Sequence, residues 1–305
     1  MNNLKKIGLT ALGTTLIASS AFAADMSVSG SASISYDQTD DKAGGSNVYM
    51  GDSINFAADG EMDNGVTVKV KYEIDGGALD DHSITFGTTD MGSLVFAGHG
   101  GGTSMSAMDD KMPQAYEESW DIVAGTPTVI NGQSGDNTFK YTSADMSGAV
   151  FTVAFVNAIN YVDFGVTVNP EMIDGLTMGY ARGDTAANNS VSDDTTESTL
   201  YAKYVIGSVT MGYQLSQANS PTSGKSLDSK GLGLTYAVTD DFSVGYHTHK
   251  LDKENNSYEQ KAQGISASFT SGSMTLAGAK NKVENIANAV GSDTNGYEMT
   301  LSFAF

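Results

Sequence analysis

The sequence predicts an all-β protein, a transmembrane antiparallel β-barrel of sixteen strands with short turns at one end and long loops at the other. Three observations predict this fold. Apolar and polar residues alternate along most of the chain, as in strands with one apolar and one polar face. Charged residues occupy the polar face of one strand, and the connections alternate between short and long. An antiparallel sheet over a soluble core would explain the alternation alone.

The first 23 residues have the features of a secretory signal peptide. Lys5 and Lys6 provide the positive start, residues 7–18 the short apolar centre, and Ala21-Phe22-Ala23 the cleavage site. A membrane anchor would need about 20 apolar residues and no processing site. We therefore expect an exported chain that begins at Ala24 and forms one barrel domain over residues 24–305.

The charge of the mature chain limits its partners. Removal of the signal removes two lysines and no acids, so 14 basic residues face 36 acidic ones and the net charge is −22. This balance argues against nucleic acid, which needs clustered Lys and Arg, and favours cations. The longest apolar run, residues 149–156, is too short for a membrane helix. Without cysteines the chain has no disulfides.

Residues 66–75 form the clearest predicted strand. Val68 and Val70 fall on its apolar face. Its polar face carries four successive charges, Lys69, Lys71, Glu73 and Asp75. A packed core could not hold these charges unpaired, whereas a water-filled lumen could.

The same alternation predicts fifteen further strands and two kinds of connection. The sixteen expected strands span residues 26–37, 53–59, 66–75, 82–88, 93–98, 137–142, 149–156, 161–168, 176–181, 198–205, 209–215, 230–237, 242–248, 262–269, 274–280 and 296–305. Tight turns are expected at 61–65, 89–92, 143–148, 169–175, 206–208, 238–241 and 270–273, and longer polar loops between them. Loops sorted by length to opposite ends are typical of an outer-membrane barrel. An even strand number returns the last strand beside the first, which leaves no free edge in lipid.

One long segment, from Gly98 to Asp136, fits neither a strand nor a helix. It contains the chain's one tryptophan, Trp120, and two of its four prolines. A segment this long without regular structure is usually functional or disordered. We interpret it as a loop that folds into the mouth of the barrel.

Three motifs carry a resemblance to a known family. They are Ala23-Ala24-Asp25-Met26-Ser27-Val28-Ser29-Gly30-Ser31 at the start, Met91-Gly92-Ser93-Leu94-Val95-Phe96-Ala97-Gly98 before the long segment, and Leu301-Ser302-Phe303-Ala304-Phe305 at the end. With the strand pattern, they make the chain resemble the general diffusion porins of Gram-negative outer membranes, the sixteen-stranded trimeric type, and most closely those of alphaproteobacteria. The resemblance implies a homotrimer in outer-membrane lipid, a constriction formed by the third outer loop (residues 99–136), and Phe305 as a barrel insertion signal.

The sequence departs from this family in two places. Family members line the wall opposite the third loop with arginines, but this chain has only Arg182, at the edge of an outer loop. Four lysines at inward-facing positions would have to replace them: Lys69, Lys71, Lys140 and Lys203. The second outer loop, residues 76–81, is short, which argues against a latch over a neighbouring subunit.

The acidic residues of the long segment are the candidate constriction. We expect five of them to line the pore: Asp109, Asp110, Glu117, Glu118 and Asp121. Facing the lysines, they would create a field across the pore that favours cations. The alternative is that they only keep an outer loop soluble.

Metal sites are weaker candidates. Asp37, Asp40 and Asp41 could hold Ca²⁺ in an outer loop, as could Asp193, Asp194 and Glu197, but solvated loop charge explains both clusters. His247 and His249 share one strand face without a third ligand nearby in the sequence.

The sequence and the resemblance together predict a passive outer-membrane diffusion channel for small hydrophilic solutes and ions, with a preference for cations and no cofactor. We expect no enzyme activity, since there is no Gly-x-Ser-x-Gly elbow and nothing singles out one histidine. The alternative function is that of a secreted or cell-surface β-rich structural or adhesion protein.

Overall fold

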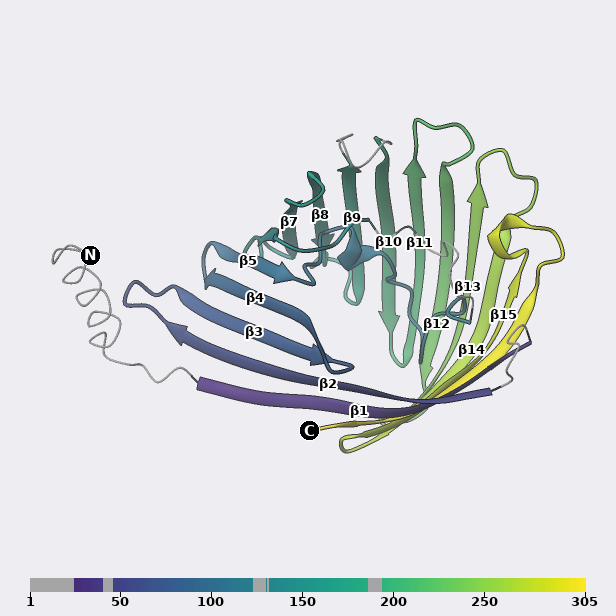
Figure 1. Cartoon of the computed structure of the whole chain (residues 1–305), viewed down its shortest axis with the longest axis horizontal. Coiled ribbons are helices and arrows are strands. Elements are labelled where there is room, and N and C mark those ends of the chain that lie inside the picture. Colours follow the sequence, from purple (N-terminus) through teal and green to yellow (C-terminus); the bar gives the residue numbers. More distant parts are fainter. Residues whose placement is uncertain (1–24, 41–45, 123–129, 131, 186–193) are drawn as a thin grey trace, which may run out of the picture.

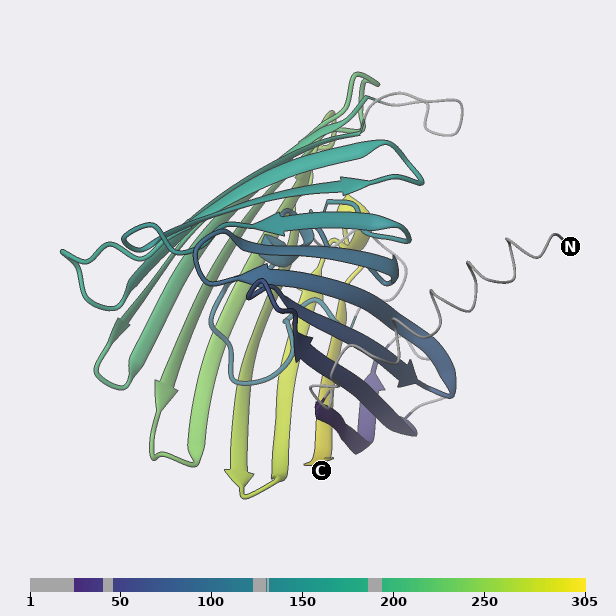
Figure 2. The ribbon, with the colours of Figure 1, turned by 90° about the vertical axis from the view of Figure 1, so that its left-hand side faces the viewer.

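The computed structural model describes residues 25–40, 46–122, 130, 132–185 and 194–305. Over these residues the chain forms a closed antiparallel barrel in which each strand pairs with the next and β16 pairs with β1 (Figures 1 and 2). The predicted signal peptide lies outside the described residues. Among the described residues, no helix is long and apolar enough to cross a membrane.

Sixteen strands make up the barrel. They are β1 (Asp25–Thr39), β2 (Ser46–Glu61), β3 (Thr67–Asp75), β4 (Ala78–Thr88), β5 (Gly92–His99), β6 (Thr138–Thr142), β7 (Ala149–Val156), β8 (Tyr161–Val168), β9 (Leu176–Thr185), β10 (Thr196–Ile206), β11 (Val209–Asn219), β12 (Leu227–Ala237), β13 (Phe242–Lys253), β14 (Gln260–Ser271), β15 (Met274–Glu284) and β16 (Thr294–Ala304). Two single-turn 3₁₀ helices, η1 (Ser106–Met108) and η2 (Ile286–Asn288), lie between strands. All sixteen predicted strands are confirmed.

Several strands are longer than predicted, mainly toward the long loops. β2 begins at Ser46 rather than residue 53, because residues 46–52 still pair with β1, with Val48 opposite Tyr36 and Met50 opposite Ile34, and these two apolar side chains continue the exposed outer face. β13 continues to Lys253 for the same reason. The strands therefore continue beyond their predicted ends, because the backbone hydrogen bonds between strands need a neighbouring strand and not a particular side-chain polarity.

Two predictions about chain segments need correction. The segment 76–81 is not a loop, because its residues from Ala78 on belong to β4 and only Gly76 and Gly77 turn, with φ of 56° and 80°. Phe305 lies just beyond β16, although its backbone still exchanges hydrogen bonds of 2.8 and 3.0 Å with Gly30 of β1.

The two faces of the barrel differ in the way the alternation predicts. Large apolar side chains point outward and are exposed, as Met211, Tyr213 and Leu215 are on β11. Between them, Gln214 and Ser216 point inward and are buried. A soluble protein would bury the apolar side chains, so this arrangement requires lipid around the barrel.

The buried apolar residues lie inside the barrel, where one loop packs against the inner wall. One cluster combines Met105, Met108 and Met112 of that loop with wall residues such as Tyr201. A second combines Trp120 and Ile122 with Ala262 and Val283 of the wall. The interior is therefore organised around this loop.

Candidate functional site

The segment between β5 and β6, residues 100–137, is called loop 3 here. It enters the barrel and follows the inner wall toward β12 and β13 (Figure 1). Its described residues contact β8, β11, β13, β14 and β16. On β14, Ser266 Oγ accepts a hydrogen bond from the Ala115 N–H at 3.2 Å. The predicted inward fold of this segment thus has a structural basis in a series of anchors along the wall.

The two ends of loop 3 meet at a neck. Gly101 and Gly135 exchange backbone hydrogen bonds of 3.0 and 3.1 Å. The imidazole Nδ1 of His99 lies 2.7 Å from the carboxylate of Asp136. These contacts close the loop at its base, so that loop 3 leaves the wall and returns to it at nearly the same place.

The first anchor on the wall is the buried carboxylate of Asp163 on β8. It accepts hydrogen bonds from the backbone N–H groups of Ser104 (3.1 Å) and Met105 (2.7 Å). The ammonium group of Lys140 on β6 donates to the Thr103 carbonyl at 3.1 Å. Asp163 is only 1 % exposed, and burying a carboxylate costs free energy unless hydrogen bonds replace those to water. Loop 3 supplies these hydrogen bonds, so its docking stabilises the buried carboxylate.

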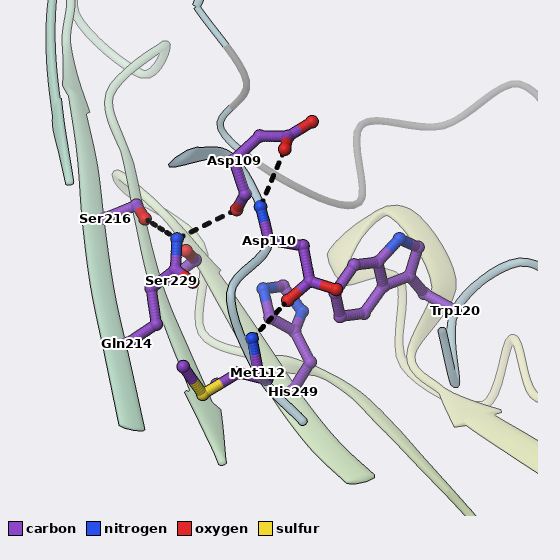
Figure 3. A pocket seen from close by; sticks show the side chains of 9 residues that line it. Asp109, Asp110, Met112, Trp120, Gln214, Ser216, Ser229 and His249 are labelled. Atoms are coloured by element: carbon purple, nitrogen blue, oxygen red, sulfur yellow. Dashed lines mark hydrogen bonds between the residues drawn. The ribbon is translucent and has the colours of Figure 1, made fainter. Parts of the chain in front are cut away.

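The second anchor is Gln214 on β11, which binds the loop with both ends of its amide. Its Nε2 donates to the carbonyls of Met108 (2.8 Å) and Asp109 (2.9 Å), and its Oε1 accepts from the Lys111 N–H at 2.8 Å. Figure 3 shows this amide beside the loop acids Asp109 and Asp110. The side chain therefore determines where the acids sit on the wall.

Between these anchors and the next, the loop crosses a track of glycines. A Cβ atom at Gly233 of β12 would lie 2.4 Å from the Pro113 carbonyl oxygen, and one at Gly212 of β11 2.6 Å from the Pro113 ring. A Cβ at Gly245 of β13 would lie 2.9 Å from the Ala115 nitrogen. The missing side chains let the loop backbone approach the sheet directly.

The last anchors involve aromatic residues. Trp120 packs against His247 and His249 of β13, with ring centroids 5.0 and 4.3 Å apart. Ser119 Oγ bonds His247 Nδ1 at 2.8 Å. Tyr116 OH lies 2.6 Å from Thr300 Oγ1 of β16. Loop 3 is thereby attached over half the circumference of the barrel.

The structure brings the five predicted loop acids together in two groups. Asp109 and Asp110 are half-buried beside β11, and a carboxylate oxygen of Asp110 accepts from the Met112 N–H at 3.0 Å (Figure 3). The other three acids converge so that one carboxylate oxygen from each lies within 4.8 Å of the others: Glu117, Glu118 and Asp121. Glu117 and Asp121 keep part of their surface exposed.

Burial, and then the crowding of neighbouring acids, affects the protonation of these groups. Burial raises the pKa of Asp110 well above its usual range, and the neighbouring Glu118 adds to the effect. Burial and the charge of Glu118 do the same to the pKa of Asp121. Burial, followed by Glu118, also raises the pKa of Glu117. The negative charge of this surface is therefore sensitive to pH in the neutral range.

The four predicted lysines are not gathered into one wall. Lys69 and Lys71 lie on β3, eight strands from β11 in either direction around the ring, and so across the barrel from Asp109 and Asp110. Lys71 is paired locally, with Glu73 at 2.7 Å and Asp81 at 3.8 Å. The other two lie on the same side as loop 3, Lys140 beneath its neck and Lys203 opposite Gly212 in the β10–β11 register.

Within the described part of the chain, the residues predicted for metal binding do not form a group of three ligands. Asp37 lies on β1, Asp40 accepts a hydrogen bond from Asn295 at 3.0 Å, and Asp41 lies outside the described residues. Asp193 of the second acidic group also lies outside the described residues. Among the described residues, the one group of three acids or histidines that converges is Glu117, Glu118 and Asp121. His247 and His249 instead pack against Trp120.

Sequence reasoning missed several residues that position the site. Asp163, Gln214 and the glycines under Pro113 hold the loop, and Lys111 places a positive charge among the acids. The glycines at alternate inward positions, Gly231 and Gly233, were a readable signal, since an inward face without side chains indicates the close approach of another segment.

Comparison with known proteins agrees with this architecture. The family model for Gram-negative porins matches residues 8–305. A loop-deletion mutant of OmpT, an outer membrane protein of Vibrio cholerae, superimposes with a TM-score of 0.69 and 12 % identity over 93 % of this chain and 100 % of that chain. A triple mutant of the Rhodopseudomonas blastica porin gives a TM-score of 0.66 and 14 % identity over 92 % and 100 %. Among curated proteins the comparison found no match.

These structural relatives are too distant in sequence to show more than the fold. The family match, in contrast, covers nearly the whole chain. It agrees with the closed sixteen-stranded barrel, its apolar outer face and its inward loop. The chain belongs to the Gram-negative porin family and is a diffusion channel of the outer membrane.

Proposed function

We propose that this channel passes small hydrophilic solutes and ions down their gradients, prefers cations, and has its constriction at loop 3. One observation carries the proposal: five carboxylates of loop 3 lie inside the barrel, held there by anchors on five strands. Loop 3 narrows the lumen, and its acids place negative charge where every passing solute comes close.

The argument for cation preference rests on the local balance of charge. Loop 3 contains six acids and one lysine, Lys111; Asp136 is paired with His99 at the neck, and the other five acids lie further along the loop. Across the lumen, Lys71 is largely compensated by Glu73 and Asp81, which leaves Lys69 as the less compensated positive charge on β3. The field across the constriction therefore has a strong negative side and a weak positive side, an arrangement that attracts cations.

We further propose that the mature protein starts at Ala24, that Phe305 assists insertion, and that three copies assemble in outer-membrane lipid. The trimer is supported by a solved Vibrio cholerae OmpT structure that is described as a trimer form and has a TM-score of 0.67 to this chain at 12 % identity. Passive conduction needs no cofactor and no catalytic residue. We infer no enzyme activity, and the family match weighs against the surface structural alternative.

The reversal potential of single channels in a planar bilayer under a salt gradient tests the proposal. We expect a cation-sided potential in the native channel. It should move toward zero when the five loop acids are neutralised together: Asp109→Asn, Asp110→Asn, Glu117→Gln, Glu118→Gln and Asp121→Asn.

A matched control neutralises five exposed acids of the short turns: Asp63, Asp90, Asp145, Asp174 and Asp240. This variant loses the same charge and should keep the native potential. Equal effects of the two variants would show that net charge, rather than the constriction, sets selectivity. Absence of conductance from correctly folded protein would overturn the channel itself.

A further inference from the structure

A group of lysines lies on the outside of the barrel, away from the pore. Five outward-facing lysines occupy the neighbouring strands β12–β15, near the end of the long loops: Lys230, Lys250, Lys261, Lys280 and Lys282. They face the surroundings of the barrel because they are in phase with exposed apolar residues such as Leu232, Tyr246 and Ile265. The sequence contains 15 lysines in all, two of them in the signal, so this small area holds a large share.

The strand register places these lysines next to one another. Lys230 is opposite Lys250, and Lys250 is opposite Lys261. Lys280 lies opposite Ile265 and Lys282 opposite Gln263, one strand further on. Like charges directly opposite each other on a sheet are unfavourable, so the arrangement calls for a compensating negative charge.

The protein supplies only part of that charge. Glu259 lies 2.8 Å from Lys250 and 3.7 Å from Lys261, and Glu284 lies 2.5 Å from Lys282. Asp228 and Asp252 form the next row toward the loops. Lys230 and Lys280 have no ion-pair partner within the described part of the chain. In a protein with far more acids than bases, this is an unusual place for unpaired positive charge.

An apolar groove begins where the lysines end. It has a volume of about 860 Å³ and lies over β13–β16. Lys280 lines its end toward the long loops, and its walls include Val244, Ile265, Leu276 and Met299. Its floor is low because Ala267 and Gly278 carry little or no side chain. Cationic groups above an apolar channel match a molecule with an anionic head and an alkyl chain.

We propose that this outer face of β12–β15 is a binding site for a phosphorylated, acylated lipid of the outer leaflet. The headgroup phosphate lies on the lysines, with Lys230 and Lys280 as its main contacts, and one acyl chain occupies the groove. The long-loop end of an outer-membrane barrel faces the outer leaflet, which fixes the leaflet. The proposal rests on the location of the barrel and not on the ion selectivity of its pore.

Binding of purified lipopolysaccharide to the full folded protein in detergent tests the site. The double variant Lys230→Gln, Lys280→Gln should bind it roughly 30-fold more weakly, as expected for two lost lysine–headgroup contacts. The control variant Lys225→Gln, Lys253→Gln loses the same charge near the long loops and should bind as the native protein does. Native-like binding by the first variant, or equal loss in the control, would overturn the site.

Three further measurements separate the lipid from other occupants. Enzymatic removal of the lipid phosphates should weaken binding to the native protein as much as the double variant does. Inorganic phosphate alone should not compete at millimolar concentration; competition would assign the lysines to a free anion instead. Ala267→Trp fills the groove and should also weaken lipid binding.

The remaining measurements address a second copy and the pore. A disulfide formed between subunits by Ile265→Cys would show that another copy covers the groove, and would overturn the proposal. Conductance and reversal potential of the double variant should stay native, because these lysines face away from the lumen. Loss of lipid binding with native conduction therefore tests this site independently of the proposed selectivity.

Discussion

Gly233 of β12 lies so close to Pro113 of loop 3 that a Cβ at this position would come within 2.4 Å of the Pro113 carbonyl oxygen. The contact is between backbone and backbone, so neither side can yield by a change of rotamer. It is the tightest point of the track that keeps loop 3 against the wall. The width of the constriction thus depends on the absence of side chains from the strands beneath it.

Gly233→Val should lift loop 3 from the wall while the barrel remains closed. An added side chain at a close contact costs about 1–3 kcal/mol, which local displacement of the loop relieves. Trp120 is the chain's one tryptophan and is 5 % exposed, so its fluorescence reports on docking. We expect a red shift of its emission and altered conductance. Gly60→Val is the control, since no atom lies within 4 Å of a Cβ there.

Asp163→Ala should release the start of loop 3, because two buried N–H groups of Ser104 and Met105 lose their acceptor. Each unsatisfied group costs about 1–3 kcal/mol. Trypsin offers a direct readout, since Lys111 follows this anchor. We expect cleavage after Lys111 at least several-fold faster than in the native protein. The exposed turn variant Glu171→Ala should be cleaved at the native rate, and unchanged cleavage of Asp163→Ala would rule out this anchor.

Cation selectivity should fall on mild acidification. Burial and neighbouring acids raise the pKa values of Asp110, Glu117 and Asp121, so these groups take up protons at a higher pH than ordinary carboxylates. Protonation removes negative charge from the constriction. The reversal potential should therefore move toward zero as the pH falls from 8 to 5. Ordinary Asp and Glu side chains titrate near pH 4, so they would not produce a change in this range.

The same titration in Asp110→Asn, Glu117→Gln, Asp121→Asn provides the control for this pH effect. The triple variant should show a flat profile between pH 8 and pH 5. If it keeps the native pH dependence, other groups control the selectivity. The raised pKa values also make stability depend on pH. The folded protein binds these protons more tightly than the unfolded chain, so protonation of the acids favours folding at low pH. This stabilisation is lost as the pH rises through the pKa values of the folded state.

Lys69→Gln should increase cation preference, because Lys69 is the less compensated positive charge across the lumen. Lys71→Gln should have a smaller effect, since its charge is already matched by Glu73 and Asp81. Reversal potentials of the two variants in the same salt gradient provide the comparison. An equal or larger shift for Lys71→Gln would contradict the charge balance described for β3.

The sequence by itself determined the barrel. Alternation with a period of two is a local property, and it identified all sixteen strands and the two faces of the barrel wall. It also located loop 3 and its acids, because a long segment without periodicity is visible at once. Strand ends were less predictable: Asp52 interrupts the apolar outer face of β2, and the pairing with β1 shows that the strand nevertheless extends to Ser46.

Only the tertiary structure decided how the site is assembled. Asp163 and Gln214 look like any inward polar residues until barrel closure brings them to loop 3, at sequence separations of 58 and 106 residues. Closure also separated the predicted lysines, with Lys69 across the lumen and Lys140 beneath the loop neck. The reason is geometric: strand position around the ring fixes which residues share the pore, and that position arises from pairing of the whole sheet rather than from any local stretch.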